Sequence, residues 1–398
     1  MKIGMFHSGT YPTHPRIYNE ARTLIEQKHE VYLFCHSADK SEKKYELIAG
    51  IHVVRMNFSK LLHKLTALAY TVPFYHLLLK KRIEQFLEIH HIEAIHIHNI
   101  QIARSVFWAN HKKIPVILDL HENLPEIMKE YPHLKSFLGR LFINPKTWKK
   151  HEFSYIKKAN KVLTVTELAN DYYLKNTQEK KEKFIALPNT VRKDFAKNYS
   201  VEKKILDRYQ NHFTLLYLGD LGERRGLLTV LKSLKKIIPV IPSIKLVLVG
   251  NSSEEYLLKE YSLSNKLDQY VDFEGWKDFS LFQSYIKASS IGLCPIHKNI
   301  HHNTTYANKL FQYMAFGKPI IASNCDAQEH LINTHRCGLI FEDKNSDDFA
   351  KKVIRIYKDS EFYNELSKNA LQSIQNELSW ELLSKKMVDY YQELSMKQ

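Results

Sequence analysis

The chain has 398 residues, of which 44% are hydrophobic and 12% aromatic. This composition excludes a disordered chain, and the length predicts two domains of roughly 200 residues each rather than one hydrophobic core. The 58 lysines and arginines outnumber the 43 aspartates and glutamates, so the net charge is +15. This surplus favours an anionic partner, namely a nucleic acid, a phosphorylated substrate or an acidic membrane face. The alternative is a lysine-rich composition whose charges are merely solvated, because it would give the same net charge.

Cysteine usage and the N-terminal segment indicate a compartment. The four cysteines, Cys35, Cys294, Cys325 and Cys337, have no CxxC spacing, which argues against a zinc ribbon or a disulfide framework and fits a reducing cytosol. The first twelve residues contain one lysine and no long apolar run, so we expect no signal peptide. No apolar run approaches the length of a membrane-spanning helix, so we expect none.

Short apolar segments alternate with helical patterns in two series along the chain. In the first series, strands are expected at 1–6, 31–36, 94–98, 116–121, 161–166 and 184–189, with a helix at 17–27. A polar, lysine-rich segment at 189–207 follows. In the second series, strands are expected at 213–220, 245–251, 271–276, 291–296, 319–323 and 338–341, with helices at 227–238 and 308–317. Such alternation is typical of parallel sheets covered on both faces, so we predict two doubly wound α/β domains facing across a cleft. The last helix, at 380–394, fits either domain.

Two stretches of the first half combine apolar residues with lysines. Residues 58–82 and 135–150 both have this character. A basic amphipathic stretch of this kind can lie in an anionic membrane interface. The alternative is a set of core-facing helices whose lysines lie on the solvent side.

Several well-known catalytic motifs are absent from the sequence. No G-x-G-x-x-G follows the first strand, and neither a P-loop, an HExxH nor a GxSxG is present. A dinucleotide dehydrogenase and a P-loop enzyme are therefore disfavoured. His96 and His98 lie in one expected strand, and we expect them on opposite faces, which predicts no metal pair there.

The second series contains a glycine-rich loop between a strand and a helix. In LLYLGDLGERRGLLTVLKSL, three glycines allow tight turns, and Arg224 and Arg225 come just before the helix. Helix amides together with a guanidinium group are suited to bind a phosphate. Trp276 lies at the end of the strand expected at 271–276, where it lines a ligand crevice or packs half-buried.

The stretch NKLFQYMAFGKPIIAS at 308–323 predicts a helix, a turn and a buried strand. A polar cluster at 301–305 precedes it, and Gln312 lies in the middle of the helix between aromatic neighbours. The helix either packs only, or it holds a charged ligand at its N-terminus.

The order of these motifs resembles that of the retaining glycosyltransferases of family 4. GDLGERRG, LVLVG, VDFEGW, IGLCP, NKLFQYMAFGKPIIAS and CGLIF resemble the C-terminal half of that family, and THPRIYNEARTLIEQKHEVYLF and VILDLHENLPE resemble its N-terminal half. The resemblance covers almost the whole chain and implies the GT-B fold, with two Rossmann-like domains. It implies an acceptor-binding domain at 1–192, a nucleotide-sugar-binding domain at 193–375, and a C-terminal helix at 376–398 that packs back on the first domain.

The resemblance also implies a site for the donor diphosphate. The residues that match the family's diphosphate contacts are Gly9, Arg225, Asn308, Lys309 and Leu310. The position of a second basic residue in the family is occupied by Asp220 here, so we expect Arg224 or Lys309 to supply its charge. Two cations are needed because the leaving group is a nucleoside diphosphate and the family uses no bound metal.

Other positions correspond to the nucleoside, the transferred sugar and the acceptor. The family's glutamate pair is replaced by Thr304, expected at the donor sugar, and by Gln312, expected with Gly250 and Trp276 at the nucleoside. His121 of the DLHE segment matches a histidine near the anomeric centre and is the expected catalytic residue, although a histidine that only caps a strand remains the alternative. Arg16 is an acceptor-side candidate.

The implied function is the transfer of a hexose from a UDP-, GDP- or similar sugar to a saccharide or lipid-linked acceptor in surface polysaccharide or glycolipid synthesis. We expect a cytoplasmic enzyme, peripheral on the inner face of the plasma membrane, without a metal or other cofactor and without a nucleic-acid partner. A nucleotide-sugar-binding scaffold without turnover is the main alternative, motivated by Asp220, Thr304 and Gln312. A nucleotide-sugar epimerase would need a set of carboxylates and histidines in its cleft, and nucleic-acid binding would need a steep salt dependence.

Overall fold

The computed structural model describes residues 1–12, 15–37, 39, 41–57, 69–70, 74–130, 134, 143–197 and 199–396. The chain forms two compact units, Met1–Pro188 with Ser384–Gln398, and Asn189–Leu383. The first and last segments of the second unit lie side by side. Thr190 Oγ1 donates to the carbonyl of Leu378, and the amide of Trp380 donates to the carbonyl of Val191. Both contacts lie within the second unit. The expected domain bounds of 192/193 and 375/376 stay a prediction.

The first unit contains an eight-stranded sheet in the order β3-β4-β2-β1-β5-β6-β7-β8. The strands are β1 (Lys2–His7), β2 (Glu30–Ser37), β3 (Tyr45–Ile48), β4 (Ile51–Asn57), β5 (Ala94–His98), β6 (Val116–Leu120), β7 (Lys161–Thr164) and β8 (Phe184–Ala186). All pairs are parallel except the hairpin β3–β4, which the sequence analysis did not predict. The chain turns back at β1, so the ends of β1 and β5 form the switch point at which open α/β sheets bind ligands.

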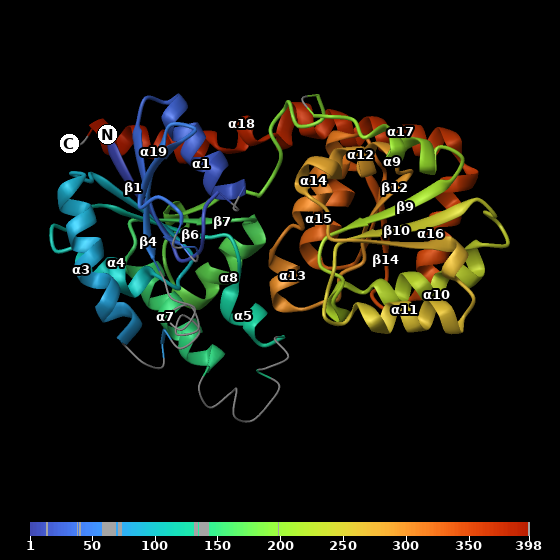
Figure 1. The fold of residues 1–398 in the computed structure, drawn as a ribbon, viewed down its shortest axis with the longest axis horizontal. Coiled ribbons are helices and arrows are strands. Elements are labelled where there is room, and N and C mark those ends of the chain that lie inside the picture. Colours follow the sequence, from blue (N-terminus) through green and yellow to red (C-terminus); the bar gives the residue numbers. More distant parts are fainter. Residues whose placement is uncertain are drawn as a thin grey trace. The chain divides into compact units, whose positions relative to one another are not determined.

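Helices lie on both faces of this sheet (Figure 1). They are α1 (Pro15–Glu26), α3 (Phe74–Ile89), α4 (Ala103–Ala109), α5 (Leu124–Met128), α7 (Pro145–Lys158), α8 (Glu167–Thr177) and α19 (Lys385–Met396), with a 3₁₀ turn at Lys181–Lys183. The main apolar core contains Ile95 and Ile97 of β5. Their neighbours His96 and His98 point to the other face, because successive side chains of a strand alternate. On that face, His96 contacts Glu20 of α1 and Tyr391 of α19.

The second unit contains a six-stranded parallel sheet in the order β11-β10-β9-β12-β13-β14. The strands are β9 (Phe213–Leu218), β10 (Ile244–Val249), β11 (Val271–Gly275), β12 (Ile291–Cys294), β13 (Ile320–Ser323) and β14 (Gly338–Phe341). Successive residues of β9 face two separate cores. Leu215 and Tyr217 pack with α10, and Leu216 and Leu218 pack with α14. The prediction of doubly wound parallel sheets from the two series of apolar strands is confirmed.

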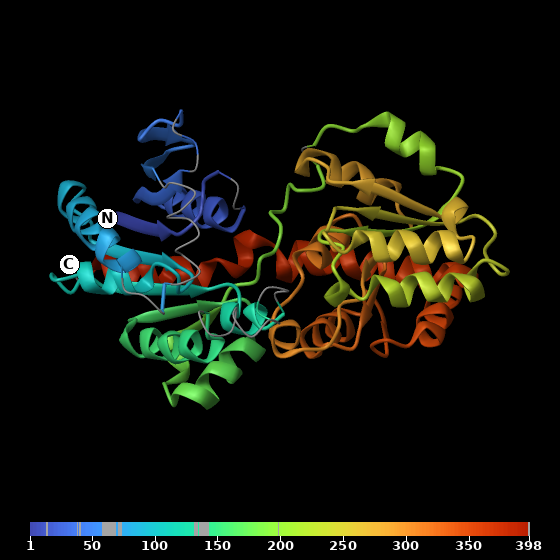
Figure 2. The same cartoon turned by 60° about the horizontal axis from the view of Figure 1, so that its bottom comes forward.

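The helices of the second unit cover both faces of this sheet (Figure 2). They are α9 (Lys203–Tyr209), α10 (Leu227–Ile237), α11 (Glu255–Ser264), α12 (Phe282–Ala288), α13 (Ile300–Thr304), α14 (Asn308–Ala315), α15 (Asp326–His335), α16 (Ser346–Lys358), α17 (Ser360–Ser373) and α18 (Trp380–Leu383). Short 3₁₀ turns lie at Glu223–Arg225, Asp268–Tyr270 and Phe279–Leu281, and a π-helical turn lies at Ile374–Leu378. No helix in the described ranges is long and apolar enough to cross a membrane.

Two glycines follow the neighbouring strands β9 and β10 at the carboxyl edge of the second sheet. Gly219 has φ of 124° and Gly250 has φ of 143°, values that residues with a side chain rarely adopt. A Cβ atom added at Gly250 would lie 1.9 Å from the carbonyl oxygen of Gly219. The two strand ends therefore approach each other more closely than any side chain would permit.

We expect Gly250→Ala to lower the free energy of unfolding by about 3 kcal/mol, because it combines positive-φ strain with a backbone clash. Gly275→Ala is the matched control, since Gly275 also has positive φ, at 68°, but nothing lies within 4 Å of an added Cβ. The control should cost only the left-handed strain, about 1–2 kcal/mol. Urea denaturation followed by circular dichroism measures both values, and equal losses would contradict the role of the close approach.

Candidate functional site

A cluster of cationic side chains lies at the carboxyl end of β9 in the second unit. Lys309, in the first turn of α14, places its Nζ 3.5 Å from the centroid of the Tyr217 ring. No carboxylate within the described ranges forms an ion pair with this ammonium group. Burial, with a contribution from the charge of Arg225, lowers the pKa of Lys309 to about 7. A lysine in this state is suited to bind an incoming anion, because the anion would restore its charge.

Arg225 lies beside this lysine on the glycine-rich loop and is held by Asp220. Its Nε is 3.1 Å from Asp220 Oδ2, and Arg224 Nη2 is 3.5 Å from the same oxygen. Asp220 therefore orients two guanidinium groups, whereas the resemblance placed a further cation at this position. Gly226 ends the loop with φ of 70°, and an added Cβ would lie 1.9 Å from the carbonyl oxygen of Pro295. The loop is thus fixed at both ends.

The remaining expected residues of α14 have different environments. Asn308 is exposed and Gln312 is half-buried, so both side chains can reach a ligand. Leu310 is fully buried in the core, and its amide donates to the carbonyl of Ala307. The side chain of Leu310 is therefore a packing residue rather than a diphosphate contact. Gly317, expected to end this helix, has φ of 62°.

Trp276 and Thr304 also differ in the exposure of their side chains. Trp276 follows β11 and is 65% exposed, so it is not half-buried and its ring is open to stacking. Thr304 is buried, and its hydroxyl donates to the carbonyl of Ile300 at 2.9 Å, within its own helix. Its hydrogen is therefore committed, and the hydroxyl can act toward a sugar only as an acceptor. His301 and His302, which precede Thr304 in the same helix, were not predicted as site residues. Burial lowers their pKa values to about 3 and about 4.

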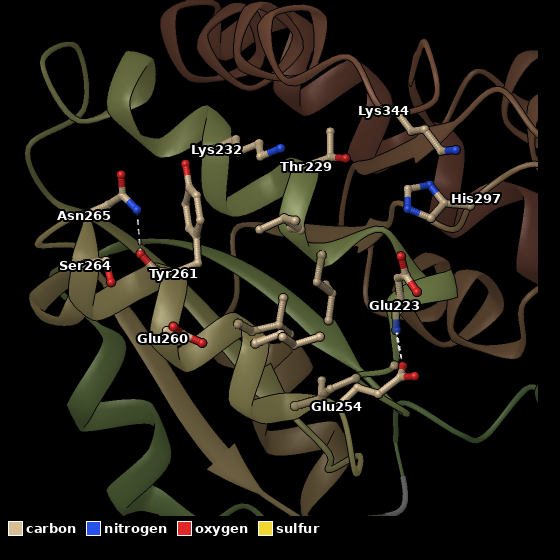
Figure 3. Close-up of a pocket in the computed structure, with 16 residues that line it drawn as sticks. Glu223, Thr229, Lys232, Glu254, Glu260, Tyr261, Ser264, Asn265, His297 and Lys344 are labelled. Carbon is tan, nitrogen blue, oxygen red and sulfur yellow. Dashed lines mark hydrogen bonds between the residues drawn. The ribbon is translucent and has the colours of Figure 1, made fainter. Parts of the chain in front are cut away.

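A pocket of about 570 Å³ lies behind the glycine-rich loop (Figure 3). Thr229 and Lys232 of α10 line one wall, and Glu260 and Tyr261 of α11 line the other. Its edge is closed by Glu254, whose carboxylate accepts a hydrogen bond from the amide of Glu223 at 2.8 Å. The pocket does not include Arg225, Lys309, Trp276 or Gln312. The pocket therefore lies behind the loop and is separate from the cationic site.

In the first unit, His121 lies just after β6 and is oriented by two neighbours. Its Nδ1 is 2.8 Å from Asp119 Oδ2, and its Nε2 is 3.1 Å from Asn99 Nδ2. Burial alone would raise the pKa of Asp119, but Arg16 and His121 hold it well below its usual range. The ionised carboxylate assigns the proton of the imidazole to Nδ1, which leaves Nε2 as an acceptor.

Arg16 is buried, and its guanidinium group is used within the unit. Its Nη2 and Nε donate to Asp119 at 2.7 and 2.8 Å, and its Nη1 donates to the carbonyl of Leu187 at 2.8 Å. The structure thus places Arg16 beneath His121 and not on an exposed acceptor surface. Gly9 follows β1, where an added Cβ would lie 2.5 Å from His7 Nε2.

The expectation that His96 and His98 lie on opposite faces is wrong. Their rings stack with centroids 4.6 Å apart and an interplanar angle of 19°. Residues two apart in a strand share a face, since only adjacent residues alternate. Together with Glu20 and Asp119 they bring four ligand-type atoms within 4.8 Å of one another, all buried.

Two family profiles match the chain, one in each half. The profile described as Glycosyltransferase Family 4 matches residues 15–195, and that described as Glycosyl transferases group 1 matches residues 199–373. An uncharacterized glycosyltransferase of Methanocaldococcus jannaschii is 22% identical over 267 residues, which cover 64% of this chain and 66% of the relative. Phosphatidyl-myo-inositol mannosyltransferase of Mycolicibacterium smegmatis is 23% identical over 193 residues, 48% of each chain. These matches span less than two thirds of either relative.

Solved structures cover the chain more completely. Sucrose-phosphate synthase from Thermosynechococcus elongatus has a TM-score of 0.79 over 100% of both chains at 16% identity. HepE of Anabaena in complex with UDP-glucose has a TM-score of 0.70 over 99% of this chain and 100% of that one, at 14% identity. At these identities the likeness shows the GT-B fold alone. With one family profile over each half, the chain belongs to the family 4, group 1 glycosyltransferases.

Proposed function

We propose that this glycosyltransferase moves a hexose from a nucleoside diphosphate donor to an acceptor hydroxyl, with retention of the anomeric configuration. The observation that carries the proposal is the ammonium group of Lys309, which forms no ion pair with a carboxylate in the described part of the chain. It lies near the charge of Arg225, at the carboxyl end of a central parallel strand. A leaving nucleoside diphosphate gains negative charge, and fixed cations in a partly buried site stabilise that charge. HepE was solved with UDP and with UDP-glucose, so UDP-sugars are the first donors to test.

In this proposal the chain's own groups replace a metal or other cofactor at the leaving group. Arg225, Lys309 and the first amides of α14 bind the diphosphate, with Asn308 beside them. Trp276 stacks on the base, and the Gln312 amide bonds the ribose hydroxyls, with Gly250 permitting close approach of the backbone. The replacement of a carboxylate by Thr304 weakens the hold on the transferred sugar.

His121 is proposed to orient the transferred sugar near its reacting carbon. Its Nδ1 is engaged with Asp119, so its Nε2 accepts a hydrogen bond from a sugar hydroxyl in place of Asn99. Gly9 is proposed to let the backbone after β1 approach the diphosphate. The buried guanidinium of Arg16 acts through Asp119 rather than on the acceptor.

We further propose a cytoplasmic enzyme that docks on the anionic inner face of a membrane, where it uses a lipid-linked or saccharide acceptor for surface polysaccharide or glycolipid. A groove of about 530 Å³ along α7 is lined by five lysines around Phe153. Lys146, Lys150 and Lys157 are exposed on it, and α3 exposes Phe74 and Leu77. Residues 58–68, 71–73 and 135–142 of the two basic stretches lie outside the described residues. Exposed lysines and exposed apolar side chains in one unit suit an anionic interface.

A donor panel with cell-derived lipid acceptors tests the reaction. We expect one nucleoside diphosphate to be released and the product anomer, read by NMR, to match the donor. Arg225→Ala should lower kcat/KM by about 100-fold, because one charged contact to the leaving group is removed. Arg355→Ala, which removes a guanidinium from α16, should leave kcat/KM unchanged. Binding of a nucleotide without turnover would favour a scaffold, and an isomerised donor would favour an epimerase.

The pKa of about 7 for Lys309 predicts a pH dependence of nucleotide binding. The bound diphosphate requires the charged lysine, so above pH 7 binding must take up one proton. We expect the Kd for UDP to rise by up to about tenfold per pH unit between pH 7 and 9, and to be nearly flat below pH 7. Calorimetry in two buffers of different ionisation enthalpy measures this uptake. Lys309→Met should abolish it, and a Kd independent of pH in the unaltered protein would contradict it.

Membrane docking predicts a loss on charge reversal. Replacement of Lys146, Lys150 and Lys157 by glutamate should abolish co-sedimentation with vesicles that contain phosphatidylglycerol, since each basic residue near such a surface contributes about 1 kcal/mol. The same replacement of Lys232, Lys235 and Lys236 on α10 changes the net charge equally and should leave binding largely intact. Equal losses in both variants would indicate a general charge effect and overturn the assignment to α7.

A further inference from the structure

A continuous chain of buried polar side chains connects the C-terminal helix to His121 within the first unit. Tyr391 of α19 places its hydroxyl 2.8 Å from His96 Nδ1, and His96 Nε2 is 3.3 Å from Glu20 Oε2. Glu20 Oε1 is 3.0 Å from Arg16 Nε, and Arg16 holds Asp119, the partner of His121. Every member is at most 4% exposed. The proposed chemistry uses Arg16, Asp119 and His121, and it assigns no role to Tyr391, His96 or Glu20.

The two carboxyl groups that flank Arg16 are not equivalent. Asp119 accepts hydrogen bonds from Arg16 Nε and Nη2 and from His121, and His98 Nδ1 also lies 3.2 Å from its Oδ2. Glu20 lies at ion-pair distance from Arg16, but neither of its oxygens accepts a hydrogen bond within the described residues. A buried carboxylate without hydrogen bonds is costly, whereas a buried carboxylic acid is not. Burial accordingly raises the pKa of Glu20 well above its usual value. One guanidinium thus neutralises one carboxylate, Asp119, and Glu20 keeps its proton.

The proton on Glu20 determines the tautomer of His96. The nearest nitrogen to Glu20 Oε2 is His96 Nε2, which has no hydrogen-bond partner among the described residues and is therefore available as the acceptor. The neutral imidazole then carries its own hydrogen on Nδ1, and this hydrogen points to the oxygen of Tyr391. Burial lowers the pKa of His96 well below its usual value, which agrees with a neutral ring.

A metal ion is the other occupant that these residues suggest, since Glu20, His96, His98 and Asp119 bring ligand atoms within 4.8 Å. Arg16 opposes it. The guanidinium lies within 3.0 Å of both carboxyl groups, and Asp119 Oδ2 already accepts from Arg16 Nε and from His121 Nδ1. A divalent cation would add charge to a fully buried cluster that is neutral with a proton on Glu20.

We infer that Tyr391 and His96 are positioning residues for His121, acting through the proton that they hold on Glu20. The inference rests on the proposed role of His121. Without the Tyr391 oxygen, His96 Nδ1–H has no acceptor, and the ring takes the other tautomer, with Nε2–H toward Glu20. That arrangement favours an ionised Glu20, which competes with Asp119 for Arg16 and loosens the partner that orients His121.

The first test uses ¹⁵N-histidine NMR of the full chain, which reports which ring nitrogen carries hydrogen. The His96 signals are assigned by their loss in His96→Asn. We expect Nδ1–H in the unaltered protein and Nε2–H in Tyr391→Phe, which removes only the hydroxyl. Tyr390→Phe, on the same helix, should keep Nδ1–H. Nε2–H in the unaltered protein, or the same tautomer in Tyr391→Phe, would overturn the inference, as would one equivalent of bound metal by elemental analysis.

A second test separates the proton on Glu20 from its charge. Glu20→Gln keeps a neutral donor at this position and should retain Nδ1–H on His96, whereas Glu20→Ala should lose it. A change of tautomer in Glu20→Gln would show that the carboxylate is needed, and would overturn the inference.

Kinetic measurements test whether the connected buried side chains from Tyr391 to His121 affect turnover. Tyr391→Phe should lower kcat by about tenfold, the equivalent of one hydrogen bond, with the KM for the donor unchanged. Unchanged kcat beside an altered tautomer would overturn the link to His121. If the unaltered protein transfers no sugar from any donor, the proposed function fails, and the tautomer measurement still decides the state of Glu20.

Discussion

The ion pair between Arg16 and Asp119 is the interaction on which the first unit depends. Both side chains are buried, and two hydrogen bonds of 2.7 and 2.8 Å join them. The pair ties α1 to the end of β6, and a third bond from Arg16 ties both to Leu187 at the end of the unit. Removal of either partner would leave a buried charge, which is strongly destabilising. The same pair fixes Asp119 as the partner of His121, so the packing of this face and the orientation of the candidate catalytic group have one origin.

In the described part of the second unit, the charged site is not neutralised by a buried ion pair. Its cations are only partly enclosed, and Lys309 rests on an aromatic ring instead of a carboxylate. The glycine contact between the ends of β9 and β10 keeps side chains away from this place. One unit thus neutralises its buried charges internally, whereas the other leaves a cation available for a ligand.

Much of the fold followed from the sequence, because parallel strands buried on both faces form long apolar runs. The hairpin β3–β4 was not predicted because its strands are not continuous apolar runs. Tyr45–Ile48 alternates exposed and half-buried residues, Ile51–Asn57 alternates buried and half-buried ones, and both include charged residues. The fate of individual site residues was less accessible. Arg16, Leu310 and Thr304 lie at positions that match the family, yet their side chains are committed to the protein itself. Pairing and burial depend on which distant residue lies opposite, and a single sequence does not contain that information. His96 and His98 were different, since the two-residue period of a strand already places them on one face.

The chain re-enters the first unit at Ser384, and this has a consequence for protein synthesis. Met1–Pro188 is made first, but the helix Lys385–Met396, which supplies Tyr391 to its buried polar face, is made only after all of Asn189–Leu383. During synthesis the first unit therefore lacks the contact from Tyr391 to His96 until Asn189–Leu383 has been made. The cluster is completed only by Lys385–Met396, so a ribosome that stops before this helix leaves the sheet of the first unit without one of its own helices.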